Sequence, residues 1–195
     1  KNIYKLEPGS FLIVNKDRIS IQENKKYFNI KNITKNENIV NKSFEFYKTQ
    51  TFNLLEASVK KQMLSDAPIG AFLSSGIDSS IICSLMQKNS INKINTFTIG
   101  FEDQNFNEAN IAKSISNFLG TNHQELFLSK NDLLNIIPNI TSVYDEPFAD
   151  SSQIPTIFLS SLASKSVKVA LTGDGADELF GGYQRYSIIS QFIKI

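Results

Sequence analysis

Residues 74–80, SSGIDSS, combine four serines, one glycine and one aspartate between two apolar runs. Serine hydroxyls can donate hydrogen bonds to phosphate, and Gly76 can adopt backbone angles that turn its amide toward a ligand. A helix that follows such a loop adds free N–H groups and a positive dipole end. The loop lacks the lysine of the G-x-x-x-x-G-K-S/T P-loop. A serine-rich turn with Asp78 as a helix cap is the structural alternative.

A second unusual segment, TGDGADELFGGY at 172–183, carries acidic residues among four glycines. Mg²⁺ normally binds through one or two carboxylates plus substrate phosphates, so Asp78 of the first loop and the acids here could share a cation. Asp177 and Glu178 could instead complement the dipole of a helix N-terminus. That alternative leaves the glycines unexplained, and close approach of the backbone to a ligand is the better explanation for them.

Alternating strands and helices must position these two loops. From residue 43 onward, apolar residues at three- and four-residue spacing indicate helices, and short apolar runs indicate strands. Alternation of this kind predicts right-handed βαβ units and a doubly wound parallel sheet of the α/β class, with ligands bound beyond the carboxyl ends of the strands. The predicted strands are 69–73, 94–101, 123–128 and 167–172; the predicted helices are one from Ser43 to about residue 65, those near 78–88 and 107–119, and segments within 130–165.

Local signals add detail to this pattern. Ser129 and Asp132 have the spacing of a capping box that opens a helix. Pro138 is expected to kink or break that helix. His123 is the only histidine and begins a predicted strand, and a structural role is favoured over catalysis because no partner residues are visible in the sequence.

The N-terminal part of the chain differs in character. Residues 1–28 predict three short strands, IYKL, SFLIV and RISIQ, separated by turn-forming residues. Three short strands cannot bury a face alone, so they predict the end of a β domain. Residues 29–42 are rich in Asn and Lys without periodicity and predict a linker, and residues 43–195 form the α/β domain. The start without methionine and the end within a helical pattern suggest a fragment.

Bulk composition excludes several functional classes. The net charge is +1 and only two of the 20 basic residues are arginines, which argues against nucleic-acid binding. No apolar run approaches the roughly 20 residues that cross a bilayer, and no signal peptide is visible. One cysteine excludes an internal disulfide framework and favours the cytoplasm. Cys83 lies in an apolar helical pattern, which favours a buried structural thiol over a nucleophile.

Five stretches together resemble a known family. FLSSGIDSS resembles the S-G-G-x-D-S loop of the N-type (PP-loop) ATP pyrophosphatases, whose fold is of the adenine nucleotide alpha hydrolase type. TGDGADELFGGY resembles a segment of one branch, the glutamine-hydrolysing asparagine synthetases, as do DEPFADSSQIP (145–155) and the stretch from TFTIGFED to NHQEL. IYKLEPGSFLIV is similar to the last strands of that family's class II glutamine amidotransferase domain.

The resemblance implies an ATP-dependent amidotransferase. One domain would hydrolyse glutamine to ammonia, and the other would transfer AMP to a carboxylate, with aspartate as the default substrate, before ammonia displaces AMP. The cofactors implied are ATP and Mg²⁺. The partners implied are small molecules, namely ATP, aspartate or another carboxylate, and ammonia from glutamine, with no nucleic acid and no membrane; a homodimer is left open.

The resemblance also assigns roles by position. Asp78 and Asp177 would bind Mg²⁺, and Asp174 would orient the amine or take its proton. The remaining residues fall into three groups: Ser74, Ser75, Gly76, Ser79 and Ser80 around pyrophosphate; Leu73, Ile99, Thr172 and Gly173 around adenine and ribose; Asp145, Glu146, Asp150 and Arg185 on the substrate side. Arg185 could pair with a substrate carboxylate or be a surface arginine.

The sequence departs from the family pattern at some positions, and other functions compete with the one described above. Ser75 replaces a glycine of the family loop, and its hydroxyl could add a donor. The family's N-terminal nucleophilic cysteine and its later lysine have no counterpart here, so this fragment alone is expected to be inactive. The rival functions are an amidotransferase acting on a sugar or peptide carboxylate, a GMP or NAD synthetase, which the 172–183 loop disfavours, and a non-catalytic nucleotide-binding relative.

Overall fold

The computed structural model describes residues 4–15, 17, 20–29, 32, 42–102 and 107–193. The chain divides into two compact units, residues 1–48 and 49–195. Within the described residues, no helix combines the length and apolar character needed to span a membrane.

The elements in chain order are β1 Ser10–Asn15, β2 Ser20–Lys26, α2 Phe44–Gln62, β3 Ile69–Phe72, α3 Ile77–Lys88, β4 Asn95–Phe101, α4 Ala109–Leu119, β5 Asn122–Leu128, α5 Lys130–Ile136, the 3-10 turn η2 Ile137–Asn139, α6 Ile140–Val143, α7 Gln153–Ser164, β6 Val169–Leu171, α8 Ala176–Phe180 and α9 Gln184–Ile193.

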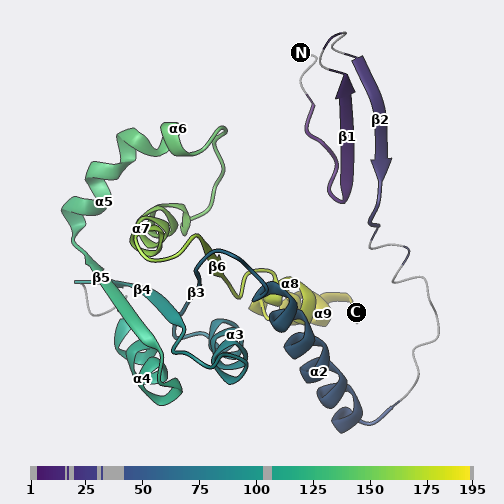
Figure 1. The fold of residues 1–195 in the computed structure, drawn as a ribbon. Coiled ribbons are helices and arrows are strands. Elements are labelled where there is room, and N and C mark those ends of the chain that lie inside the picture. The colour runs from purple at the N-terminus through teal and green to yellow at the C-terminus, as the bar shows by residue number, and fades with distance from the viewer. Residues whose placement is uncertain are drawn as a thin grey trace. The chain divides into compact units, whose positions relative to one another are not determined.

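The second unit is built on a four-stranded parallel sheet with strand order β5-β4-β3-β6. The chain runs outward from β3 through β4 to β5, and then returns to the other side of β3 as β6. Strand order therefore reverses between β3 and β6. Figure 1 shows α3 and α4 on one face of the sheet and α7 on the other. The predicted doubly wound α/β fold is confirmed.

Each face of the sheet has its own hydrophobic core. On one face, Cys83 and Met86 of α3 pack with Ala71 of β3 and Val59 of α2. On the other face, the fully buried Phe97 of β4 packs with residues of α7 and its C-terminal end. A parallel sheet covered on both faces requires strands that are apolar on both sides, which explains the continuous apolar runs in the sequence.

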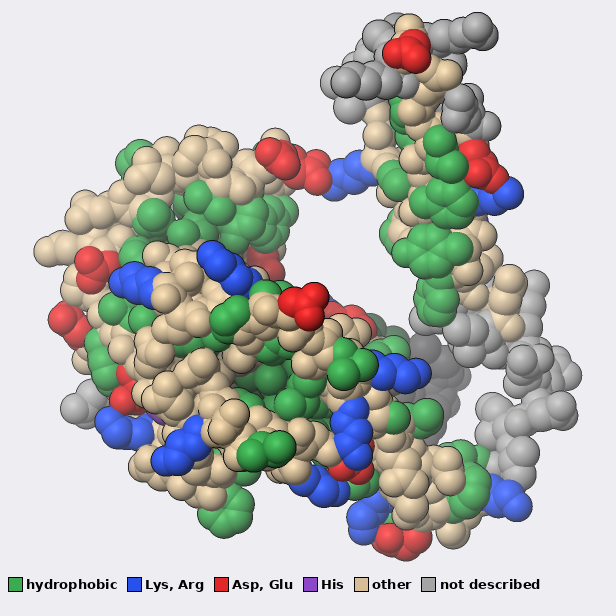
Figure 2. All heavy atoms as spheres, in the orientation of Figure 1, with side chains coloured by type: hydrophobic (Ala, Val, Ile, Leu, Met, Phe, Trp, Pro, Cys, Tyr) green, Lys and Arg blue, Asp and Glu red, His purple; other side chains and the backbone are tan. Residues whose placement is uncertain are grey.

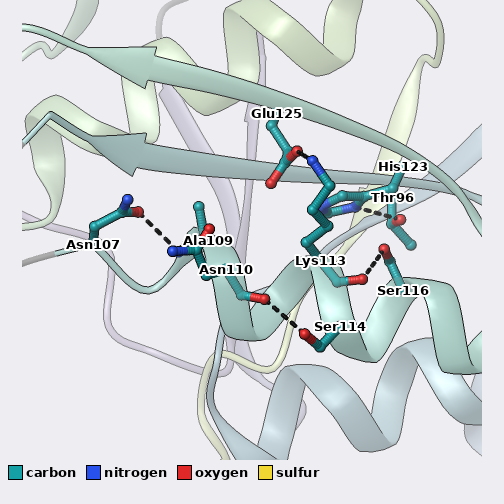
Figure 3. Close-up of polar contacts among 9 residues, drawn as sticks. All are labelled: Thr96, Asn107, Ala109, Asn110, Lys113, Ser114, Ser116, His123 and Glu125. Carbon is teal, nitrogen blue, oxygen red and sulfur yellow. Dashed lines mark hydrogen bonds and ion pairs between the residues drawn. The ribbon is translucent and has the colours of Figure 1, made fainter. Parts of the chain in front are cut away.

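Local sequence signals explain how α4 and α5 begin. The Asn107 side chain accepts a hydrogen bond from the Ala109 amide at 3.1 Å, just before α4 (Figure 3). Ser129 and Asp132 form the predicted capping box of α5. The 3-10 turn η2 contains Pro138 and separates α5 from α6, as expected from the missing proline amide.

The first unit contains an antiparallel hairpin of β1 and β2. The prediction of a strand at IYKL is wrong for its described residues 4–6, which lack strand structure. Most of the predicted linker 29–42 lies outside the described residues. Phe11, Leu12, Ile13 and Val14 of β1 are all exposed, and Figure 2 shows apolar side chains along this hairpin. A two-stranded hairpin with so little buried surface is marginally stable at best by itself.

Candidate functional site

The two polar loops predicted from the sequence follow adjacent strands. Residues 74–80 come directly after β3, and residues 172–183 come directly after β6, which pairs with β3 in parallel register. Because the carboxyl ends of parallel strands lie at one edge of a sheet, both loops emerge at that edge. This edge is also where strand order reverses, the usual location of a ligand crevice in an open α/β sheet.

The two loops touch through their backbones at Gly173. A Cβ atom built on Gly173 would lie 2.8 Å from the Ser79 backbone nitrogen and 3.0 Å from the Asp78 carbonyl carbon. Such distances are well inside van der Waals contact, and backbone atoms cannot rotate away as a flexible side chain can. Only glycine therefore allows this approach of the 172–183 loop to the start of α3.

The glycines have structural roles that the sequence did not indicate. Gly76 has φ −72° and ψ 152°, an extended conformation open to any residue, so the expected special backbone angles are absent. Gly173 allows close contact with the protein backbone at the start of α3. A Cβ on Gly182 would collide with the Asp177 carboxylate, while Gly175 and Gly181 take positive φ at the two ends of α8. These glycines shape the loop itself.

Hydrogen bonds within the 74–80 loop hold its serines in place. The Ser74 and Ser79 hydroxyls lie 2.8 Å apart, and the Gly76 amide donates to the Ser74 hydroxyl at 3.1 Å. The Ser80 hydroxyl donates to the Gly76 carbonyl at 2.6 Å. Asp78 is not the helix cap of α3. The cap position is Gly76, and α3 has no capping hydrogen bond from a side chain.

Ser75 has a partner that the sequence did not indicate. Its hydroxyl donates to the carboxylate of Glu108, the residue before α4. The serine that replaces the family glycine thus links the loop to a neighbouring element and does not line the cavity described next. The expectation that its hydroxyl adds a phosphate donor gains no support from this geometry.

A cavity of about 790 Å³ lies at the loop edge, within the range typical of ligand sites. Both loops contribute to its wall, and α7 and the segment before it supply the rest. Its lining residues are Phe72, Leu73, Ser74, Gly76, Asp78, Ser79, Tyr144, Phe148, Asp150, Ser152, Gln153, Thr156, Leu159, Thr172, Gly173, Asp174, Gly175, Asp177, Glu178 and Tyr183. Asp78 and Asp177, more than 90 residues apart in sequence, therefore face one cavity.

Most but not all of the predicted site residues line this cavity. Those that do are Leu73, Ser74, Gly76, Asp78, Ser79, Asp150, Thr172, Gly173, Asp174 and Asp177. Those outside the lining are Ser75, Ser80, Ile99, Asp145, Glu146 and Arg185. The Leu73 backbone already has internal partners, since its amide donates to the Phe97 carbonyl and its carbonyl accepts from the Thr98 hydroxyl at 2.5 Å.

Sequence reasoning missed the aromatic part of the wall. Tyr144 and Phe148 stack edge to face with ring centroids 4.8 Å apart, and the Tyr144 hydroxyl donates to the Gln153 carbonyl. Tyr144 directly precedes DEPFADSSQIP and Phe148 lies within it. Tyr183 is the last residue of the second motif. The available signal was the presence of these aromatic residues in or beside the two motifs.

The cavity wall is acidic. It contains five carboxylates and, among its described residues, no Lys, Arg or His. Hydrogen bonds from the Ser152 side chain and backbone lower the pKa of Asp150, and a hydrogen bond from Tyr183 is the main cause of the lowered pKa of Glu178. Both groups are thus held ionised near neutral pH, and an anionic ligand here needs a cation as counter-charge.

The donor set suits a magnesium ion shared with a phosphate ligand. The described residues contain no cluster of three or more His, Cys, Asp or Glu suited to a metal. Mg²⁺ does not require one, because it usually takes one or two carboxylates, several waters and substrate phosphates. Asp78 and Asp177, half-buried carboxylates facing one cavity, fit that pattern.

Two reactive side chains lie away from the cavity. Cys83 is fully buried in the core, and burial raises the pKa of its thiol to about 12. Nδ1 of His123 lies 2.9 Å from the Thr96 hydroxyl (Figure 3), and burial lowers the pKa of the ring. In the same cluster Lys113 binds Glu125 at 2.8 Å. These contacts support the structural roles predicted for Cys83 and His123.

Comparison with known proteins places this geometry in a family. The model of the asparagine synthase family matches residues 51–192, which is more than half of the chain and includes both loops. The chain belongs to the asparagine synthase family. It is 45% identical over 129 residues to glutamine-hydrolysing asparagine synthetase 1 of Bacillus subtilis, covering 66% of this chain and 20% of the relative.

A second relative extends the similarity to the N-terminal unit. A protein of Methanocaldococcus jannaschii, provisionally named glutamine-hydrolysing asparagine synthetase 2, is 35% identical over 192 residues. That match covers 95% of this chain and 35% of the relative. The chain therefore spans only a fifth to about a third of the length of these relatives.

Among solved structures, an NH3-dependent NAD synthetase from Campylobacter jejuni is similar with a TM-score of 0.46 and 15% sequence identity. The match covers 73% of this chain and 61% of that chain.

Proposed function

We propose that this chain is the nucleotide-binding part of an ATP-dependent amidotransferase of the asparagine synthetase type. The enzyme transfers AMP to a carboxylate, with aspartate as the first candidate, and then converts the activated carboxylate to an amide with ammonia derived from glutamine. One observation carries the proposal: the 74–80 and 172–183 loops abut at Gly173 and line one acidic cavity at the edge where strand order reverses.

The first loop would bind the pyrophosphate part of ATP. Hydroxyls of Ser74 and Ser79 line the cavity beside the amino end of the 12-residue helix α3. Free amides and the positive dipole end of a helix favour bound anions. Ser75 and Ser80 remain predicted ligands, although their hydroxyls have internal partners. Leu73, Thr172 and Gly173 would contact adenine and ribose, and Ile99 stays a prediction outside the cavity lining.

Asp78 and Asp177 would hold Mg²⁺ together with the phosphates. The bound ion would supply the positive charge that an acidic cavity needs before it accepts a polyanion. The protein's own contribution is positioning: the Gly173 contact fixes the distance between the two loops, and preorganised charges of this kind require little rearrangement during reaction.

The proposed reaction has two displacement steps. A carboxylate oxygen of the substrate attacks the α-phosphorus, and the bond from that phosphorus to the bridging oxygen of pyrophosphate breaks. Ammonia then attacks the acyl carbon, AMP leaves, and the nitrogen loses a proton. Asp174 is the candidate to orient the amine or take that proton. The Thr172 hydroxyl donates to Asp174 Oδ2 at 3.0 Å, which holds the carboxylate at the cavity wall.

The N-terminal hairpin is proposed to be the end of a class II glutamine amidotransferase domain. Its exposed apolar residues, Phe11 to Val14, favour burial within a larger β structure. Residues 43–195 would then be the synthetase part. A cytoplasmic location and a homodimer remain predictions, as do substrate contacts of Asp145, Glu146 and Asp150.

The test is ATP–pyrophosphate exchange by the full-length protein, screened over amino-acid, sugar and peptide carboxylates. Exchange that requires aspartate supports the synthetase proposal. Exchange with a sugar or peptide acid supports the alternative within the family and refutes aspartate as substrate. No exchange with any acid refutes adenylation and favours a non-catalytic nucleotide-binding protein.

A further inference from the structure

Arg185 lies next to the cavity but does not line it. Its guanidinium carbon is 4.1 Å from the centre of the Tyr183 ring and 5.7 Å from the centre of the Tyr186 ring. The two rings meet edge to face with centroids 5.6 Å apart. An arginine over an aromatic face is attracted by the ring quadrupole and restrains the ring.

Tyr183 connects this cluster to the cavity. Its hydroxyl donates to Glu178 Oε1 at 2.8 Å, and both residues line the cavity wall. A hydrogen bond from a neutral hydroxyl to a carboxylate is stronger than one between neutral groups. The side chains therefore form a connected series from Arg185 through Tyr183 to Glu178.

We propose that Arg185 is a positioning residue that holds Tyr183 in place, so that the Tyr183 hydroxyl fixes the Glu178 carboxylate at the cavity wall. This inference rests on the proposed function, and it gives Arg185 a role other than pairing directly with a substrate carboxylate. The arginine contributes its planar stacking surface, and it places a positive charge beside Tyr183 of a wall whose described lining residues include no cation.

The test is a double-mutant cycle in the full-length protein with Arg185→Met and Tyr183→Phe. A cation–π contact at an exposed site is worth about 0.5–1 kcal/mol, so Arg185→Met should lower kcat/KM of exchange about 2- to 5-fold. Tyr183→Phe removes a hydrogen bond to a charged group and should lower it about 10-fold or more. The double variant should match Tyr183→Phe, because Arg185 acts through that hydroxyl.

Two controls separate positioning from direct binding. Tyr186→Phe keeps the second ring and removes only a hydroxyl outside the cavity lining, so it should leave exchange unchanged. Arg185→Lys keeps the charge without the planar stacking group and should restore only part of the loss. Additive effects of Arg185→Met and Tyr183→Phe, or a loss confined to KM for the acid substrate, overturn the proposal.

A second readout does not depend on activity. The ring carbons of Tyr183 are observed by NMR in protein carrying ¹³C-labelled tyrosine, with Tyr183→Phe used for assignment. Shifted or broadened Tyr183 ring signals in Arg185→Met support the proposal, because the stacked guanidinium restrains the ring, and unchanged ring signals overturn it. If wild-type protein performs no exchange, the proposed function fails, and the ring signals alone decide the role of Arg185.

Discussion

Substituting Gly173 with alanine tests the contact between the two loops. The added methyl group would lie 2.8 Å from the Ser79 amide nitrogen and 3.0 Å from both the Asp78 carbonyl carbon and its Cβ. Two of these three atoms belong to the backbone at the start of α3. The 172–183 loop must therefore move away from the 74–80 loop, and Asp177 moves away from Asp78.

The expected cost follows from this crowding. Inserting a methyl group into a well-packed contact costs about 1–3 kcal/mol, which urea unfolding at pH 7 would detect. Saturating Mg-ATP should stabilise the wild-type full-length protein by about 2.7 kcal/mol at a hundredfold excess over Kd. In Gly173→Ala this stabilisation should largely disappear, because the two halves of the site no longer face each other.

Gly120→Ala is the matched control. Gly120 has φ +72° at the end of α4 and no atom within 4 Å of an added Cβ, so the substitution strains the backbone without crowding a neighbour. It should cost about 1–2 kcal/mol of stability and leave the Mg-ATP stabilisation intact. The reasoning is refuted if Gly173→Ala keeps the full Mg-ATP stabilisation, or if the two variants lose it equally.

Three further predictions concern the fold. Asp132→Asn should reduce stability at pH 7, because hydrogen bonds from Ser129 depress the pKa of Asp132 below the ordinary 3.8. That stabilisation is present above the ordinary pKa and is lost as pH falls through the lowered pKa, so wild type and variant should converge at acidic pH in urea unfolding. Cys83 should react with a thiol reagent at pH 8 only after unfolding, because its buried thiol has a pKa of about 12; fast labelling of native protein would contradict its burial. Phe97→Ala should lower the free energy of unfolding in urea by about 3–5 kcal/mol, because the ring of this β4 residue is fully buried against α7. A loss below about 1 kcal/mol would contradict this packing.

Elements with strong local signals were predictable from the sequence. The strands and helices from residue 69 to residue 128 differ from their predicted bounds by at most two residues at each end. The capping box at Ser129 and the break at Pro138 also appear as expected, because hydrogen bonding within a few residues decides them. The shared edge of the two loops followed from the parallel arrangement of their strands.

Features that depend on distant contacts were not predictable. Nothing near Ser75 in the sequence indicates Glu108, which the fold brings to it from 33 residues away. The contact of Gly173 with the backbone of α3 was not predicted, because the two segments are remote in sequence. Arg185 was considered as a partner of a substrate carboxylate or as a surface arginine, and its contact with the rings of Tyr183 and Tyr186 was not foreseen.

The central claim is that both loops hold one Mg-ATP, and calorimetric titration of the full-length protein tests it most directly. Wild-type protein and the control Asp66→Asn, which alters an exposed carboxylate before β3, should bind Mg-ATP alike. Asp78→Asn and Asp177→Asn should each abolish or greatly weaken binding. Undiminished binding by either of these two variants would contradict a site shared between the loops.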